Sequence, residues 1–282
     1  MRQTTSDIIE AHLAWLRLRG RSDATVRMRA GTLRRLSEHL GKRDILRVKL
    51  DDLEGFLSIR SKGQDARSVE GSHLRQFYKW AVARGHLGKD PTVLLAVPPK
   101  TRRLPRPLPI DDVIMAVELA TPDVRLLLLA AVLAGLRAGE IARLSGEDVD
   151  WGSDPPLILV HGKGGRERRV PAPPQLAAAL ADAPRSGPIV RYEDGRADHV
   201  PAWLVSQRAN QYLRSLGLTS IHTLRHTFAT WFLRESGRDL RLTQETLGHV
   251  SPVSTAIYTR VDPADAAAVA ARMELPFERR DA

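Results

Sequence analysis

Residues 156–173, PLILVHGKGGRERRVPAP, contain the one clear β-strand signal in this chain of 282 residues. An apolar run at 157–160 leads into a glycine-rich segment, which is followed by a charged return run. Two short runs separated by glycines predict an antiparallel hairpin. The segments on either side have apolar residues at helical spacing, so we expect a mostly helical domain with a small antiparallel β-sheet.

A proline-rich segment upstream of the hairpin divides the chain. Residues 97–109, VPPKTRRLPRPLP, contain five prolines in thirteen positions. Proline disrupts a helix interior and favours extended chain, so this segment marks a domain boundary. We predict an N-terminal domain at residues 1–97, a basic linker at 98–108, and a larger domain with a C-terminal tail at 109–282.

The N-terminal domain is predicted to be all helical. Four of its segments have apolar residues at helical spacing, and none alternates convincingly as a half-buried strand would. Ser6 is the predicted N-cap of the first helix, and Gly41 is the predicted end of the second. The four predicted helices span residues 6–19, 23–40, 50–60 and 66–84.

Positive charge is concentrated in the first part of the chain, although the net charge of the whole is +10. Residues 1–97 carry 19 basic and 11 acidic side chains, and the linker carries four basic side chains and no acidic one. Residues 109–282 carry 20 basic and 22 acidic side chains. A basic domain and a basic linker indicate a polyanionic partner such as nucleic acid. An arginine-rich composition is the other explanation, because 36 of the 43 basic residues are Arg.

Other features of the composition exclude several classes of protein. The chain has no cysteine, so it forms no disulfide and no thiolate metal site. Its longest apolar run, at residues 126–136, is too short to cross a bilayer. The N-terminus lacks the apolar core and cleavage site of a signal peptide. We therefore expect a soluble, cytoplasmic protein without membrane association.

The segment IHTLRHTFATWF, residues 221–232, is predicted to be an amphipathic helix. Its large apolar side chains, Trp231 among them, share the face expected to contact the core. His222, Arg225 and His226 project together from the opposite side. That polar face either is solvated or binds a ligand, and His222 and Arg225 are spaced to touch the same one.

A zinc site is the alternative for the two histidines, because His222 and His226 have the i, i+4 spacing of helical metal ligands. Thr223 stands where a metalloprotease has glutamate, and Arg225 would lie beside the cation. We therefore predict no metal and no cofactor.

Two cationic residues outside this helix stand in unusual surroundings. Arg137 emerges directly from an apolar run, where an arginine is costly to bury unless it is paired. It either forms a salt bridge to Glu140 or Glu147, or grips an oxyanion. Lys163 is the only lysine after residue 100 and lies in the predicted hairpin turn. It is either a surface lysine or a proton donor, a role that arginine cannot take.

The segment LGHVSPVSTAIYTR, residues 247–260, is predicted to contain a break between two helices. Gly248 suits the end of one helix, and Ser251-Pro252 suits the start of the next. An unbroken helix would place His249 and Tyr258 on opposite faces. The break removes that restriction, so the two side chains are free to converge.

Taken in order, these segments resemble the active-site motifs of the tyrosine recombinases, the phage integrase and Xer family. The resemblance is carried by AGLRAGEIARL (134–144), GKGGRERRVP (162–171), HTLRHTFATWFL (222–233) and the segment that ends in Tyr258. Residues 74–91, LRQFYKWAVARGHLGKDP, resemble the end of the family's core-binding, SAM-like domain. The resemblance implies a site-specific DNA recombinase whose catalytic residues are Arg137, Lys163, His222, Arg225, His249 and Tyr258.

The resemblance also implies how these residues act, without metal or nucleotide. Tyr258 attacks a scissile phosphate and forms a 3′-phosphotyrosyl intermediate, while Lys163 protonates the leaving 5′-oxygen. Arg137 and Arg225 hold the non-bridging oxygens. The remaining two residues, His222 and His249, assist proton removal from the tyrosine and hydrogen-bond the phosphate, respectively.

The implied partner is double-stranded DNA with a recombination site, bound by a homo-oligomer that is a tetramer on DNA. The C-terminal tail is expected to dock into a neighbouring protomer, although packing on its own domain is the alternative. The predicted DNA contacts are nine basic residues chosen from the second and fourth helices and the linker. They are Arg27, Arg34, Arg35, Arg67, Arg75, Lys79, Lys100, Arg102 and Arg103.

Two other functions compete with recombination at this stage. A type IB topoisomerase has a similar catalytic set and relaxes DNA without exchanging partners, and a helical DNA-binding regulator would form no covalent adduct. The chain begins with the core-binding helices, so we expect no arm-binding domain. The resemblance leaves open the target sequence and the choice between phage integration and excision, Xer-type dimer resolution and mobile-element recombination.

Overall fold

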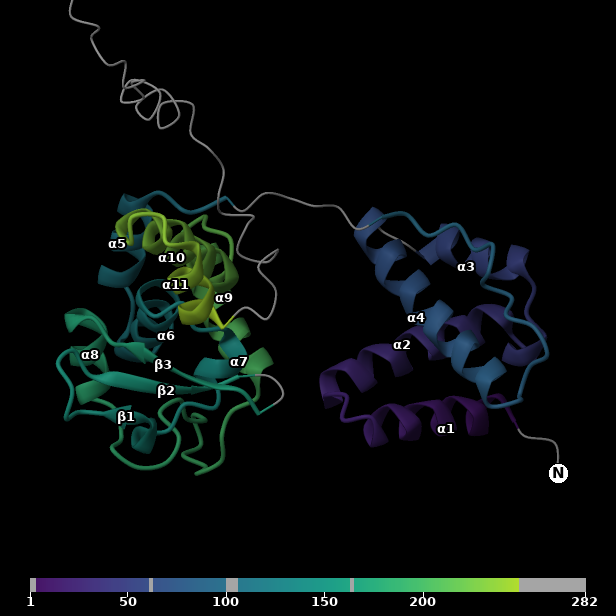
Figure 1. Cartoon of the computed structure of the whole chain (residues 1–282), viewed down its shortest axis with the longest axis horizontal. Coiled ribbons are helices and arrows are strands. Elements are labelled where there is room, and N and C mark those ends of the chain that lie inside the picture. Colours follow the sequence, from purple (N-terminus) through teal and green to yellow (C-terminus); the bar gives the residue numbers. More distant parts are fainter. Residues whose placement is uncertain (1–3, 61–62, 100–105, 163–164, 249–282) are drawn as a thin grey trace, which may run out of the picture. The chain divides into compact units, whose positions relative to one another are not determined.

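The computed structural model describes residues 4–60, 63–99, 106–162 and 165–248. The chain divides into two units, Met1–Arg103 and Leu104–Ala282 (Figure 1). The main core of the first unit draws on residues between Ile8 and Leu95, and that of the second on residues between Val113 and Leu224. Because no residue belongs to both cores, each unit buries its own apolar surface.

The described part of the first unit is all helical, as predicted. The first helix begins slightly earlier than expected, because Thr4 rather than Ser6 caps it. The Thr4 hydroxyl accepts a hydrogen bond from the Asp7 backbone N–H, and the Asp7 carboxylate accepts one from Thr4 N–H. The helices are α1 (Thr5–Leu18), α2 (Asp23–Leu40), α3 (Leu50–Arg60) and α4 (Gln64–Ala83), with a short 3-10 turn, η1 (Ile45–Arg47), before α3.

Helices α2 and α4 are joined by three polar contacts along one seam. Successive contacts advance by three residues on α2 and step back by three on α4, which is the pattern of antiparallel helices. The seam fixes which faces of the two helices remain exposed. The contacts join Arg29 to Gln76 (2.7 Å), Thr32 to His73 (2.9 Å) and Arg35 to Glu70 (2.6 Å).

The described part of the second unit consists of helices around a small sheet, as the sequence predicted. Its first two helices are α5 (Ile110–Glu118) and α6 (Pro122–Leu133). After these, α7 (Ala138–Ile141), η2 (Gly146–Asp148) and the three strands β1 (Val149–Asp150), β2 (Leu157–His161) and β3 (Glu167–Pro171) follow in order. The remaining helices are α8 (Pro174–Ala181), α9 (Ala202–Ser215), α10 (Ile221–Glu235) and α11 (Leu240–Leu247).

Helix α6 is the centre of this unit. Leu127, Leu128 and Ala131 are almost completely buried, and α8, α9 and α10 all pack against the helix. A helix that is apolar on all sides is stable only inside such a cluster, which is what its sequence predicted. Because α6 is held on several sides, residues 134–137, which follow its C-terminal end, also have a fixed position in the unit.

The three strands form one antiparallel sheet in the order β1-β2-β3 (Figure 1). The β2–β3 pair is the predicted hairpin, with Leu157 opposite Pro171 and His161 opposite Glu167. Strand β1 was not predicted, because two residues are too few to give a pattern. The hairpin holds Gly162 and Gly165 on either side of the segment that contains Lys163.

Among the described helices, none combines the length and the apolar character that crossing a membrane requires. Helix α6 is the most apolar long stretch, and its surface is covered by protein.

Candidate active site

A cavity of about 280 Å³ lies between the exit of α6, the start of α10 and one side of α9. Arg137, His222 and Arg225, three of the six predicted catalytic residues, line it. Lys163, His249 and Tyr258 lie outside the described residues. The other lining residues are Leu136, Ala138, Ser206, Asn210, Ser220 and Ile221.

Gly135 forms the turn that separates Arg137 from the buried helix α6. Its φ of +61° is in the left-handed region, and an added Cβ would lie 2.4 Å from the Phe228 ring. Glycine is therefore required both for the backbone conformation and for the close approach of α10. The carbonyl of Gly135 accepts a hydrogen bond from Arg225 Nη1, so the same turn brings Arg137 and Arg225 together.

Arg225 is buried rather than solvated, because its residue is only 2% exposed. Helix α10 is therefore not solvated at Arg225, whereas His222 on the same face is exposed. Ligand binding by this face stays a prediction. On the predicted core face, Leu224 and Phe228 are buried as expected. Trp231 is not, since it is 42% exposed and donates a hydrogen bond to Glu235.

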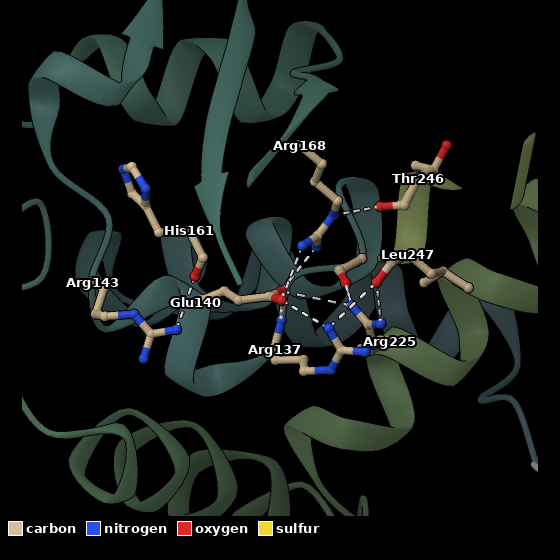
Figure 2. A network of polar contacts seen from close by, with 9 residues as sticks. Arg137, Glu140, Arg143, His161, Arg168, Arg225, Thr246 and Leu247 are labelled. Carbon is tan, nitrogen blue, oxygen red and sulfur yellow. Dashed lines mark hydrogen bonds and ion pairs between the residues drawn. The ribbon is translucent and has the colours of Figure 1, made fainter. Parts of the chain in front are cut away.

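The Glu140 carboxylate lies at the centre of the site and is the point at which the arginines meet (Figure 2). Its side chain is 3% exposed. One oxygen accepts hydrogen bonds from Arg137 Nη1 (2.8 Å) and Arg168 Nη1 (3.0 Å). The other accepts from Arg137 N (2.9 Å) and Arg168 Nη2 (2.9 Å), and Arg225 Nη1 lies 3.8 Å from it. All four lone-pair positions of the carboxylate are therefore used.

The charge of Glu140 is secured by these contacts. Burial by itself would raise the pKa of the carboxyl, but the hydrogen bonds and charges of Arg168 and Arg137 outweigh burial and lower the pKa to about 2. Glu140 is consequently ionised at any pH near neutrality. With three guanidiniums around one carboxylate, the cluster has a net positive charge and suits an anionic ligand.

The C-terminal end of α11 completes the cluster. The Leu247 carbonyl accepts hydrogen bonds from Arg225 Nη2 (2.7 Å) and Arg137 Nη1 (3.4 Å), and the Thr246 carbonyl accepts one from Arg168 Nε (2.8 Å). Carbonyls at a helix C-terminus lack helical partners and favour cations. Gly248 ends the helix in the left-handed conformation, as predicted, so the chain leaves this cluster toward His249.

His222 is held in surroundings that favour its neutral form. The His222 side chain is exposed at the cavity, but partial desolvation by the surrounding protein lowers the pKa of its imidazole, and the charges of Arg225 and Arg137 lower it further. The ring of His226 lies 4.4 Å from that of His222, and burial together with His222 and Arg225 lowers its pKa to about 4. A neutral imidazole beside two guanidiniums can accept a proton in a site whose net charge attracts phosphate.

The zinc alternative gains no further ligand from the structure. Among the residues that it describes, no three His, Asp or Glu side chains gather as a metal site would require. The second turn of α10 instead directs Arg225 toward the same cavity as His222.

His161 anchors the β2–β3 hairpin at the last strand pair before the turn segment that contains Lys163. The imidazole of His161 contacts Asp148 through Nε2 (2.9 Å) and Glu167 through Nδ1 (3.0 Å). The hydrogen bond to Asp148 is the main reason why the pKa of His161 is raised. Arg143 also donates a hydrogen bond to the His161 carbonyl, so three side chains hold the end of β2.

The predicted DNA contacts of the first unit differ in how they are engaged. Arg35 forms an ion pair with Glu70, and Arg75 donates a hydrogen bond to the Leu95 carbonyl. Lys100, Arg102 and Arg103 lie outside the described residues. Four other predicted DNA-contact residues are exposed and form no side-chain ion pair or hydrogen bond within the described residues. They are Arg27, Arg34, Arg67 and Lys79.

Sequence reasoning missed two residues of the site, Glu140 and Arg168. Glu140 entered only as a structural partner for Arg137, although its place three residues after an arginine at a helix start was visible. Arg168 shares a strand face with Val170, which is buried. A charged residue two positions from a core residue of a strand was the available signal, because alternate residues point the same way.

Comparison with known proteins identifies related sequences and folds. Residues 112–265 match the Phage integrase family, and residues 9–85 match the phage integrase N-terminal SAM-like domain. The chain is 34% identical over 296 aligned positions to tyrosine recombinase XerC of Methylobacterium sp. (strain 4-46), and the match covers 92% of this chain and 91% of that protein.

Two solved structures share the fold at low sequence identity. One is the XerH site-specific recombinase in a pre-cleavage complex with its difH substrate. It has a TM-score of 0.68 and 20% identity, and the match covers 95% of this chain and 84% of that one. The other is a lambda integrase tetramer bound to a Holliday junction, with a TM-score of 0.71, 18% identity, and coverage of 93% and 80%, respectively.

Proposed function

Because this chain belongs to the phage integrase family and is a tyrosine-type site-specific DNA recombinase, we propose that its six matching residues carry out strand cleavage and rejoining. Membership of this family favours recombination over the type IB topoisomerase alternative. The observation that carries the proposal is the convergence of Arg137, Arg225 and His222 on one cavity. The other three residues are Lys163, His249 and Tyr258.

In the proposed reaction the Tyr258 hydroxyl loses its proton and attacks the scissile phosphorus. A new phosphorus–oxygen bond forms to the tyrosine while the bond to the 5′-oxygen breaks. His222 takes up the tyrosine proton, and Lys163 donates a proton to the leaving oxygen. The products are a 3′-phosphotyrosyl protein and a free 5′-hydroxyl, and attack by a partner strand's 5′-hydroxyl reverses these bonds.

Arg137 and Arg225 stabilise the charge that develops on the non-bridging oxygens. Removing one donor to such an oxyanion typically costs about 3–4 kcal/mol of transition-state stabilisation. The guanidiniums are held by Glu140, Gly135 O and Leu247 O before any substrate is present, so little reorganisation is needed. Each step uses side chains alone, and we expect cleavage to proceed in EDTA.

We further propose that the first unit and the basic linker bind the phosphates of double-stranded DNA around the recombination site. The charge of residues 1–108 supports this, as does the match of residues 9–85 to the SAM-like domain. The related lambda integrase forms a tetramer on a Holliday junction. We propose the same assembly for this chain, with exchange of the C-terminal tail between protomers.

A suicide substrate tests the proposed nucleophile. The DNA site is first recovered by selecting bound fragments, and a nick is then placed beside the cleavage position so that the short 5′-hydroxyl fragment diffuses away. We expect the wild-type protein to form a covalent adduct on a denaturing gel and Tyr258→Phe to form none. Tyr192→Phe, which alters a tyrosine stacked on Arg196, is the matched control and retains cleavage. An adduct that survives Tyr258→Phe contradicts the proposal.

A further inference from the structure

Arg168 makes more contacts to the site than its position on a strand suggests. From β3 it donates two parallel hydrogen bonds to the Glu140 carboxylate and a third, through Nε, to the Thr246 carbonyl (Figure 2). A forked pair of this kind fixes the plane of the carboxylate as well as its distance. One guanidinium therefore joins β3, α7 and the end of α11.

Arg168 is badly placed to bind substrate itself. Its side chain is 12% exposed, and it is not among the residues that line the 280 Å³ cavity. All three of its side-chain nitrogens donate to protein oxygens. Any effect on the reaction must therefore pass through the groups that it holds.

The first of those groups is Arg137. Its Nη1 donates to Glu140 Oε1, the oxygen that also accepts from Arg168 Nη1. Among the described residues, Nε and Nη2 of Arg137 have no hydrogen-bond partner, and its side chain is 40% exposed. Glu140 thus binds Nη1 of the Arg137 guanidinium and leaves Nε and Nη2 available at the cavity. If the carboxylate turns, those donors turn with it.

The other groups are two chain segments that lead to proposed catalytic residues. Arg168 pairs with Val160 across the hairpin and lies five residues after Lys163. At the end of α11, an added Cβ on Gly248 would lie 3.0–3.2 Å from the Arg168 guanidinium, which therefore rests against the residue before His249. Arg168 thus belongs to the hairpin and contacts both Glu140 and the end of α11.

We propose that Arg168 is a positioning residue for strand cleavage, which orients Arg137 through Glu140 and fixes the hairpin and the α11 end against the same carboxylate. This inference rests on the proposed function, in which Arg137 binds the scissile phosphate. Lysine at position 168 cannot reproduce the paired hydrogen bonds to Glu140, because an ammonium is a point charge and cannot make two parallel in-plane bonds.

The test measures adduct formation with the nicked substrate at saturating protein, alongside DNA affinity from gel shifts and the thermal unfolding midpoint. A misplacement of about 1 Å in a catalytic group can cost roughly 100-fold in rate. We expect Arg168→Met to lower the cleavage rate by about that factor while DNA affinity changes less than about twofold, and Arg168→Lys to recover only part of the loss. Arg169→Met, on the exposed neighbour in the same strand, is the control and keeps the wild-type rate.

A double variant separates positioning from a general structural role. In an Arg137→Gln background the guanidinium that Arg168 orients is absent, so adding Arg168→Met should cost less than about threefold. An unchanged rate in Arg168→Met overturns the inference, and a full loss that recurs in the Arg137→Gln background overturns the orientation of Arg137 by Arg168. If Arg168→Met does not fold, Arg168→Lys is tested in both backgrounds with the same criteria. Absence of a wild-type adduct would instead refute the proposed function.

Discussion

Glu140 is the residue on which three guanidiniums converge, and its burial makes it the most sensitive charge in the site. An ionised carboxylate inside a protein is tolerated only when its hydrogen-bonding positions are filled, and here all four are. The reverse also holds, because Arg225 is buried, Arg168 is half-buried, and both lie against this carboxylate. Removing the negative charge leaves cations without compensation.

We therefore expect Glu140→Gln to lower the free energy of unfolding by about 3–5 kcal/mol, the typical cost of breaking a buried pair on one side. Urea denaturation checks this value. Glu193→Gln is the control, since that carboxylate is 94% exposed and lies 3.6 Å from Arg208. Its loss should cost less than about 1 kcal/mol. Equal effects in the two variants would show that burial of Glu140 contributes nothing.

His161 gives the site a pH dependence with a definite sign. Its folded-state pKa is raised, chiefly by the hydrogen bond to Asp148 and further by Glu167, while Arg143 contacts only its carbonyl. The stabilisation is fully present below the ordinary value of 6.5 and is lost as pH rises through the folded-state pKa. Unfolding curves at several pH values should show wild type losing more stability than His161→Gln on going from pH 6 to pH 9. Parallel curves would contradict this.

At this scale the sequence singled out three side chains that line one cavity in the structure, but it did not predict how they are held. Arg137 forms the predicted salt bridge to Glu140 and also lines the cavity, while its binding of an oxyanion stays a prediction. Arg225 was placed on a polar helix face, whereas the structure buries it against two backbone carbonyls. A helical wheel shows only one helix, so it cannot reveal that the ends of α6 and α11 meet that face.

The turn after α6 is the element whose geometry places both arginines. Gly135 combines a positive φ with a close approach to Phe228 and Leu247. We expect Gly135→Ala to lower the free energy of unfolding by about 1–2 kcal/mol, because alanine disfavours a left-handed backbone. Overpacking of its Cβ against Phe228 and Leu247 should cost about 1–3 kcal/mol more. Gly217→Ala provides the control, because Gly217 has a φ of +74° and open space at its Cβ. The two variants differ only in overpacking, which urea denaturation measures. Equal losses would mean that α10 moves aside without cost.

Elements with long periodic patterns and clear ends were predicted well. The bounds of α2 and α3 agree with the expected ranges, and the hairpin was located from its glycines. Strand β1 was missed, because two residues depend on pairing with β2 rather than on any pattern of their own. Trp231 was misplaced because the apolar arc of α10 is wider than the core that it meets. In both cases tertiary packing, rather than the local sequence pattern, determined the structure.

At the scale of the whole molecule, charge and structure divide the chain at the same region. The first unit and the linker hold the net positive charge, while the second unit is slightly negative overall yet has two arginines, Arg137 and Arg225, lining its cavity. In the proposed function, long-range attraction to DNA and local stabilisation of one phosphate are therefore assigned to different parts of the sequence. Counting charges predicted the first property. The second required knowing that residues 137, 168 and 225 are neighbours.

The basic linker offers a test of that division in the intact chain. Each phosphate neutralised by a cation contributes about 0.9 to the slope of log binding constant against log salt concentration. Replacing Lys100, Arg102, Arg103 and Arg106 by Gln should therefore reduce the slope by up to about 3.6 and weaken site and non-site DNA alike. The unfolding midpoint should not change, because the two cores lie outside this segment. Fluorescence anisotropy titrations at several salt concentrations measure the slope. An unchanged slope would mean that the linker's charge reflects only an arginine-rich composition.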